Sequence, residues 1–298
     1  SHKKIIDESV PFNMEADSLN ASILGKDASP DTEEFDLYIK EVQKEMTIKA
    51  GQKCTAIRRI IVPENFIDDV QKALSERLSN ITIGDPSIDG VRMGSLAGID
   101  QVIEVSEKVK ELSNSQYILY GDLEEFDVIG ADKNKGAFIS PILFLNENPF
   151  NKIDCHEIEA FGPVSTIMPY KTLDEAIELS RMGKGSLVCS IVTSDDSIAR
   201  DFVIKSASMH GRILVLNKDC AKESTGHGSP MPLLTHGGPG RAGGGEEMGG
   251  VRGIMHYLQR TAIQGHPTTL SKITNQYQQG GMQKKTEGHV FRKYFEEL

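Results

Sequence analysis

One cysteine of the sequence lies in a setting suited to covalent chemistry. Cys54 follows Gly51-Gln52-Lys53, and Arg58 and Arg59 come shortly after it. Nearby cations lower the pKa of a thiol and so raise the fraction of thiolate, which is the nucleophilic form. A cysteine close to basic residues is nevertheless more often a buried structural thiol. The local pattern alone leaves a nucleophilic and a structural role open.

The remaining thiols and the histidines do not suggest a metal site. Cys155, Cys189 and Cys220 are widely spaced and form no CxxC pair, so neither a zinc site nor a disulfide framework is indicated. The histidines also lack metal-ligand spacing, and we expect packing or surface roles for His210, His227, His236 and His256. We therefore predict free thiols and no metal.

A glycine-rich run from Gly237 to Gly250 could be taken for a phosphate-binding loop. It lacks the GxxxxGK[ST] order, and no clear strand precedes it. Glycine also lets two backbones pass at close range. We therefore expect this run to be a closely packed loop near a substrate entrance.

The elements that must position Cys54 alternate between helix and strand. Apolar spacing predicts a helix over 32–49, ending before Cys54, and a β-branched run predicts a strand over 56–62. We expect residues before 32 to be irregular and residues 161–163 to form a loop. Further helices are expected over 64–78, 99–112, 173–182, 197–207 and around 255–258, and further strands over 117–121, 138–145, 187–193 and 212–216. This alternation predicts an α/β fold with a largely parallel sheet covered by helices.

Composition limits the class of partner. The 298 residues are 38% hydrophobic and carry a formal net charge of −10, which argues against a nucleic-acid surface. No apolar run reaches the roughly 20 residues that span a bilayer, and Ser1-His2-Lys3-Lys4 lacks the apolar core of a signal peptide. We expect a cytoplasmic protein that binds neither nucleic acid nor membrane, and we interpret Ser1-His2 as the remnant of a cleaved tag on an excised fragment.

The stretch Gly51-Gln52-Lys53-Cys54-Thr55-Ala56-Ile57-Arg58-Arg59 resembles the cysteine signature of the aldehyde dehydrogenases. Glu15 in Met14-Glu15-Ala16-Asp17 lies where that family has its glutamate, 54 − 15 = 39 residues upstream of the cysteine. Further similarities follow in the family's order at 84–86, 138–141, 159–164, 211–217 and in the glycine-rich run that ends near Tyr257. The resemblance thus covers most of the chain.

Two phrases, Val10 to Asn20 and Ser224 to Pro230, are similar to bifunctional family members of phenylacetate degradation, in which a MaoC-like hot-dog hydratase follows the dehydrogenase. Phe291 to Leu298 resembles the opening of that hydratase. The resemblance implies that residues 1–17 are the tail of a cofactor-binding domain and that 18–275 form the catalytic domain. Residues 276–298 would be a linker and a truncated hydratase start, with the N-terminal Rossmann-type domain absent from this chain.

The resemblance also assigns roles to individual residues. Cys54 would attack the aldehyde and pass through a thiohemiacetal and a thioester, and Glu15 would activate the water that hydrolyses the thioester. Glu159 would bind the nicotinamide ribose hydroxyls, with Phe161 packed near the nicotinamide. The implied cofactor is NAD or NADP, with NADP favoured by analogy. Without the family, Glu15 and Glu159 would be ordinary loop carboxylates and Phe161 a core aromatic.

The implied reaction is the oxidation of an aldehyde to an acid, with a semialdehyde bearing a CoA thioester as the expected substrate. We expect the parent protein to form a homo-oligomer, and the chain alone to be inactive and to bind NAD(P) weakly. Two alternatives stay open: a CoA-acylating dehydrogenase, which generally lacks the glutamate base, and a non-catalytic oligomerisation module. One departure is clear, because the family's Glu-Leu-Gly-Gly-Lys is replaced by Glu15-Ala16-Asp17-Ser18-Leu19.

Overall fold

A computed structural model describes residues 3–10, 12, 14, 16–228, 230, 231, 234, 236–243, 246, 247 and 250–282. The chain divides into two compact units between Gly250 and Val251. Within the described residues, no helix is long and apolar enough to cross a membrane. The first unit contains the sheet and the predicted site residues that the structure describes.

The first unit is built on a seven-stranded sheet in the order β3-β4-β5-β2-β1-β6-β7. Neighbouring strands are parallel except β3 and β4, which are antiparallel. This confirms the predicted α/β class with a largely parallel sheet. The strands are β1 (Asn20–Leu24), β2 (Ile57–Pro63), β3 (Tyr117–Tyr120), β4 (Ile142–Leu145), β5 (Val164–Tyr170), β6 (Ser186–Val192) and β7 (His210–Leu216).

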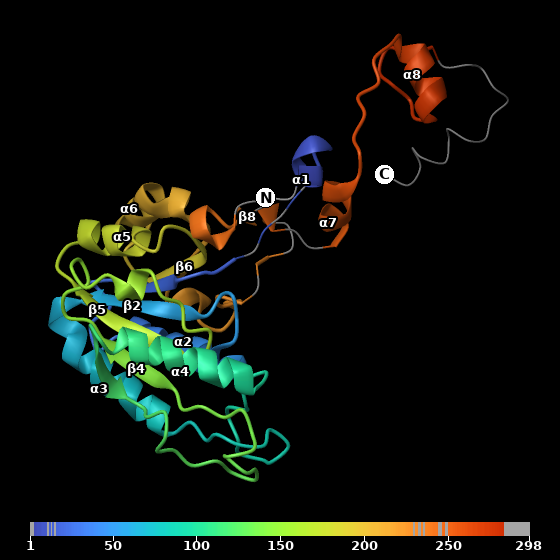
Figure 1. The fold of residues 1–298 in the computed structure, drawn as a ribbon. Coiled ribbons are helices and arrows are strands. Elements are labelled where there is room, and N and C mark those ends of the chain that lie inside the picture. Colours follow the sequence, from blue (N-terminus) through green and yellow to red (C-terminus); the bar gives the residue numbers. More distant parts are fainter. Residues whose placement is uncertain are drawn as a thin grey trace. The chain divides into compact units, whose positions relative to one another are not determined.

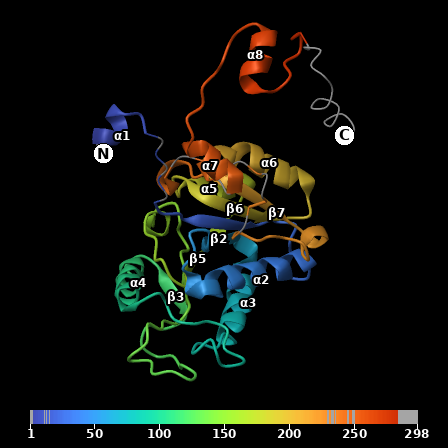
Figure 2. The ribbon, with the colours of Figure 1, turned by 90° about the vertical axis from the view of Figure 1, so that its right-hand side faces the viewer.

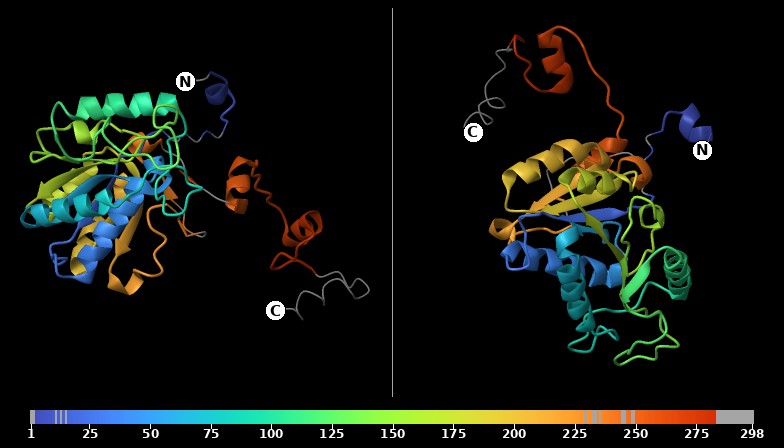
Figure 3. Two further views of the ribbon diagram at one scale, coloured as in Figure 1. Left: turned by 90° about the horizontal axis from the view of Figure 1, so that it is seen from below. Right: turned by 90° about the vertical axis from the view of Figure 1, so that its left-hand side faces the viewer.

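Helices cover both faces of the sheet (Figures 1 and 2). Alternation along β2 decides which side chain meets which layer: Ile60 and Val62 pack with α2 and α3, whereas Ile61 packs with α5 and α6. A third core joins α4 to β4, the strand next to the end strand β3. Figure 3 shows the ribbon from two further sides. The helices are α2 (Glu33–Thr47), α3 (Ile67–Ser79), α4 (Ile99–Leu112), α5 (Leu173–Arg181) and α6 (Asp196–Ser206).

Shorter elements complete the two units. The first unit also contains helix α1 (Lys3–Asp7) and a small antiparallel pair, β8 (His236–Gly237) and β9 (Glu246–Glu247). Helix α7 (Gly250–Tyr257) begins at the division, and the second unit contains α8 (Pro267–Thr274), whose first turn is capped by the His266 ring. Residues 276–282, where we expected a linker, contain neither helix nor strand.

Two strands of the sheet were not predicted from the sequence. β1 was expected to be irregular, and β5 was not recognised after the loop at 161–163. Both strands are buried but carry polar side chains, such as Ser22 in β1 and Thr166 in β5. The strand expected over 138–145 is shorter, because regular pairing starts only at Ile142, directly after Pro141.

Candidate active site

The segments that carry the predicted site residues meet at one edge of the sheet. Residues 16–18 lead into β1, Cys54 precedes β2, and Glu159 and Phe161 precede β5. These three strands are neighbours in the order β5-β2-β1 and run parallel, so their amino ends lie side by side. The candidate site is therefore at the amino ends of the strands, opposite to the edge where open α/β sheets usually bind ligands.

Cys54 is exposed on a loop whose backbone is tightly held. The Asn20 side chain donates hydrogen bonds to Cys54 O at 2.8 Å and to Ala56 O at 2.9 Å. Upstream, Lys49, Ala50 and Gly51 have φ values of 52°, 51° and 69°, a left-handed run that non-glycine residues rarely adopt. Such a conformation persists only where its surroundings enforce it, which is common at functional sites.

The other cysteines are poorly placed for nucleophilic chemistry. Cys155 and Cys189 are buried, and Cys220 is partly buried, whereas Cys54 is exposed. Burial raises the pKa of Cys155 to about 11 and that of Cys189 to about 12, so both thiols are protonated at neutral pH. This difference favours Cys54 as the reactive thiol.

The three cations close to Cys54 in the sequence have different environments. Lys53 forms an ion pair with the buried Glu45, at 2.6 Å between Nζ and Oε2. Arg59 belongs to the opposite layer, where it donates to carbonyl oxygens of Leu19, Leu179 and Ser180. Arg58 and Arg59, which are adjacent in the sequence, therefore lie in different layers, because successive side chains of a strand point to opposite faces.

Arg58 links the cysteine loop to the loop before β5. Its guanidinium donates to Gly51 O at 2.8 Å, to Gly162 O, and to Glu159 Oε1 at 3.4 Å. The guanidinium carbon also lies 5.5 Å from the centroid of the Phe161 ring. Glu159 and Phe161 are thus brought to the same place as the Cys54 loop.

Glu159 is largely buried but keeps acceptor capacity. Its Oε2 accepts the Ser18 N–H at 3.1 Å, and its Oε1 accepts from Arg58. Burial raises the pKa of this carboxyl above its usual value, against the opposing effects of Arg58 and Ser18. Each carboxylate oxygen can accept a second hydrogen bond, so the group suits a pair of hydroxyls.

Glu15 lies outside the described residues, but the segment that follows it is anchored. Asp17 forms a two-pronged ion pair with Arg241, with 2.8 Å between Arg241 Nε and Asp17 Oδ1. Arg241 also donates to the carbonyl oxygens of His156 and Glu157, close to Glu159. Asp17 belongs to the stretch that departs from the family pattern, and its partner Arg241 was not predicted as a site residue. The available signal for Arg241 was a lone cation in a glycine-rich run.

The glycine-rich run makes the close backbone approach that we expected. A Cβ added at Gly185 would lie 1.9 Å from Pro239 O, and one at Gly240 would lie 2.1 Å from Lys184 O. Only glycine permits backbones at this separation. The packing fixes Arg241, which follows Gly240, next to the site.

A cavity of about 480 Å³ opens beside the cysteine loop and is lined in part by Gln52, Gln101 and Phe161. The Gln52 side chain donates to Phe161 O at 3.2 Å and to Gln101 Oε1 at 3.1 Å. Its own Oε1 accepts the Ala97 N–H at 2.7 Å. Gln52 and Gln101 were not predicted as site residues, although Gln52 lies within the cysteine motif.

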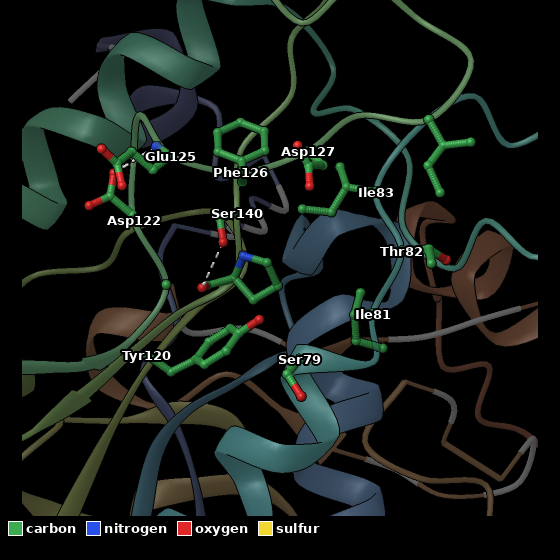
Figure 4. A pocket seen from close by; sticks show the side chains of 13 residues that line it. Ser79, Ile81, Thr82, Ile83, Tyr120, Asp122, Glu125, Phe126, Asp127 and Ser140 are labelled. Carbon is green, nitrogen blue, oxygen red and sulfur yellow. Dashed lines mark hydrogen bonds between the residues drawn. The ribbon is translucent and has the colours of Figure 1, made fainter.

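A second cavity, of about 630 Å³, lies elsewhere in the same unit. Figure 4 shows Tyr120, Phe126, Ser140 and Ile83 around it. None of the predicted site residues lines this cavity. Although this cavity is the larger of the two, its lining gives it no part in the chemistry expected of Cys54.

Comparison with known proteins identifies the family. The model of the aldehyde dehydrogenase family matches residues 3–263. A 3,4-dehydroadipyl-CoA semialdehyde dehydrogenase of Aromatoleum evansii is 38% identical over 239 residues, which are 80% of this chain and 46% of that protein. Protein MaoC of Klebsiella aerogenes is 47% identical over 208 residues, which are 69% of this chain and 60% of that protein.

Solved structures agree at the level of the fold. A betaine aldehyde dehydrogenase of Staphylococcus aureus in complex with NAD+ superposes with a TM-score of 0.72 at 23% identity, covering 86% of this chain and 47% of that one. The chain spans about half the length of the curated relatives it matches, 46% and 60% for the two named above. Because the family model matches most of the chain, residues 3–263, the chain belongs to the aldehyde dehydrogenase family.

Proposed function

We propose that this chain supplies the nucleophile and part of the cofactor site of an NAD(P)-dependent aldehyde dehydrogenase. The observation that carries the proposal is the arrangement around Arg58, which holds the loop of the exposed Cys54 against Glu159 and Phe161. A thiol nucleophile next to a carboxylate that can accept ribose hydroxyls is what thiol-dependent aldehyde oxidation requires. The cavity beside Gln52 and Phe161 offers space for a nicotinamide.

The first half-reaction assigns a definite task to Cys54. Its thiolate sulfur forms a bond to the aldehyde carbon, and the carbonyl oxygen becomes the oxygen of a thiohemiacetal. A bound nicotinamide supplies the acceptor for the hydride that leaves this carbon. Glu159 and Phe161 orient the cofactor, and oxidation leaves a thioester on Cys54.

The second half-reaction separates hydrolysis from acyl transfer. We propose that Glu15 removes a proton from water, which then attacks the thioester and releases the acid and the Cys54 thiolate. The anchoring of Asp17 by Arg241 and of the Ser18 N–H by Glu159 supports this role, since both contacts hold the segment that continues from Glu15.

We further propose that the substrate is a semialdehyde linked to CoA, in keeping with the name of the Aromatoleum relative. The proposed cofactor is NAD or NADP, and we expect NADP to be preferred. Reduction of each cofactor in the presence of short aldehydes and of CoA-linked semialdehydes would rank both choices by kcat/KM.

The test uses Cys54→Ser in the intact protein. The matched control is Cys220→Ser, because Cys220 is the other cysteine that is not fully buried. Cys54→Ser is expected to lower aldehyde-dependent cofactor reduction by at least about a thousandfold. Cys220→Ser should leave the rate within about twofold, because no role in the chemistry is assigned to this thiol.

Substantial turnover in Cys54→Ser would end the proposal. A product that forms only when free CoA is added would replace hydrolysis by acyl transfer. Absence of any aldehyde-dependent reduction in the unaltered protein would favour a non-catalytic oligomerisation module.

A further inference from the structure

Arg58 contacts the segments that carry the proposed site residues but takes no part in either proposed half-reaction. Its side chain is only 3% exposed, and its nitrogens reach different segments: Nη2 donates to Gly51 O, Nη1 to Gly162 O and Nε to Glu159. Nη2 also lies 3.4 Å from Lys53 O, one residue before Cys54. A buried guanidinium with this set of acceptors is fixed in both place and orientation.

The two loops that Arg58 joins depend on side chains for their alignment. Their backbones touch, because a Cβ added at Gly51 would lie 2.3 Å from Gly162 O. Among the hydrogen bonds of the described residues, no backbone pair connects residues 49–54 with 159–163. The connections come from Arg58 and from Gln52, which donates to Phe161 O.

We infer that Arg58 is a positioning residue that fixes Glu159 and Phe161 relative to Cys54. The inference rests on the proposed function for the roles of those three residues and adds the residue that aligns them. Because Glu159 also accepts the Ser18 N–H, one arginine connects the amino ends of β1, β2 and β5.

Arginine is the side chain that this position requires. The planar guanidinium presents donors in a rigid fork, whereas the ammonium of lysine is a point charge on a flexible stem. Burial lowers the pKa of Arg58 below its usual value, and the neighbouring carboxylate of Glu159 opposes that effect. A lysine would keep the charge but could not reach Gly51 O, Gly162 O and Glu159 together.

The first experiment measures steady-state kinetics of Arg58→Lys, Glu159→Gln and the double variant in the intact protein. Arg58→Lys is expected to raise the KM for the nicotinamide cofactor about tenfold, equivalent to about 1.4 kcal/mol, and the KM for the aldehyde less than about twofold. If Arg58 acts through Glu159, the double variant should be no worse than the poorer single variant.

The matched control is Lys184→Gln. Lys184 pairs with Glu157 at 2.9 Å, close to the same loop, but both side chains are exposed. This variant should keep the cofactor KM of the unaltered protein. Additive effects of Arg58→Lys and Glu159→Gln, or an unchanged cofactor KM in Arg58→Lys, would overturn the inference.

A second experiment does not depend on activity and uses hydrogen exchange of the 298-residue chain. Arg58→Lys should raise amide exchange in residues 49–56 and 159–164 together, and Lys184→Gln should not. Arg58→Gln, which removes the charge and keeps one amide group, serves as the second variant if the lysine variant folds poorly. Unchanged exchange in both segments, or a rise in only one of them, would refute the coupling.

The two experiments separate two kinds of failure. If the unaltered protein reduces no cofactor, the proposed function is wrong, and the exchange data still decide whether Arg58 couples the loops. If activity depends on Cys54 but the loops respond independently to Arg58→Lys, the proposed function stands and the positioning role is refuted.

Discussion

His227 is expected to make the folded chain less stable in mild acid. The side chain is 0% exposed, with Nδ1 at 3.2 Å from Thr55 O and Nε2 at 2.7 Å from the Ser190 hydroxyl oxygen. A carbonyl oxygen can only accept, so Nδ1 carries the proton of the neutral ring and Nε2 accepts from Ser190. Burial lowers the pKa of His227 from 6.5 to about 3.

The size of the effect follows from proton linkage. Between pH 6.5 and pH 3 the unfolded chain binds a proton at His227 that the folded chain does not, so stability falls as the pH falls through this window. At pH 5 the difference is about 1.5 pH units, or about 2 kcal/mol in favour of unfolding. His156 and His210, each with its pKa lowered by burial to about 3, act in the same direction.

Urea unfolding followed by circular dichroism at pH 7 and pH 5 tests this expectation. In the unaltered chain the three histidines together should lower the free energy of unfolding by about 6 kcal/mol between the two pH values, a large part of the stability of a typical domain. His227→Gln should reduce that loss by about 2 kcal/mol, whatever its stability at pH 7. Ser206→Ala, a change at a buried polar side chain that does not titrate, is the control and should leave the loss unaltered.

The quantity compared is the change in the free energy of unfolding between pH 7 and pH 5. A destabilisation that is the same at both pH values therefore does not affect it. The reasoning would be refuted if His227→Gln lost as much stability between pH 7 and pH 5 as the unaltered chain. An equal reduction of the loss in Ser206→Ala would show that the measurement does not report on the titration of His227.

Three further changes test other parts of the structure. Arg59→Met should lower the free energy of unfolding by about 3 to 5 kcal/mol in urea melts, because it leaves the buried carbonyl oxygens of Leu19, Leu179 and Ser180 without a donor; a loss below about 1 kcal/mol would contradict this. Gly51→Ala should destabilise the chain by about 2 kcal/mol or more and reduce activity, since φ is +69° and Gly162 O leaves no room for a Cβ; an unchanged melting temperature would be the contrary result. Glu15→Gln in the intact protein should keep a rapid burst of about one equivalent of reduced cofactor and slow steady turnover by about a hundredfold, with the acyl group detected by mass spectrometry; loss of the burst would place Glu15 in an earlier step.

Much of the helical layer could be predicted from the sequence. The helix expected over 99–112 is found at those bounds, and α2 differs from the expected 32–49 by only one or two residues at each end. These helices have one apolar face toward a core and one polar face toward water, so local periodicity reports their position. The same holds for β2, whose β-branched run ends at a proline.

The central strands β1 and β5 could not be recognised in this way. Their polar side chains are satisfied by partners far away in the sequence: the hydroxyls of Ser22 and Ser190 are hydrogen-bonded to each other at 2.7 Å, and Thr166 donates to Gln116 at 2.8 Å. A buried hydroxyl is compatible with a strand only when such a partner exists. Local sequence contains no information about that partner, so both segments looked irregular or went unnoticed.

The sequence by itself determined the α/β class, the motif around Cys54 and, through its family resemblance, the candidates Glu15, Glu159 and Phe161. Their catalytic and binding roles stay predictions, and the domain limits at 17 and 275 do too. Only the tertiary structure decided how neighbouring cations differ: Arg58 turns toward Glu159, whereas Arg59 donates to the end of α5. One physical reason is that adjacent side chains of a strand point to opposite layers. The other is that parallel pairing of β5, β2 and β1 brings distant segments to the same ends of the strands, as in the Arg58–Glu159 pair, whose members are 101 residues apart in the sequence.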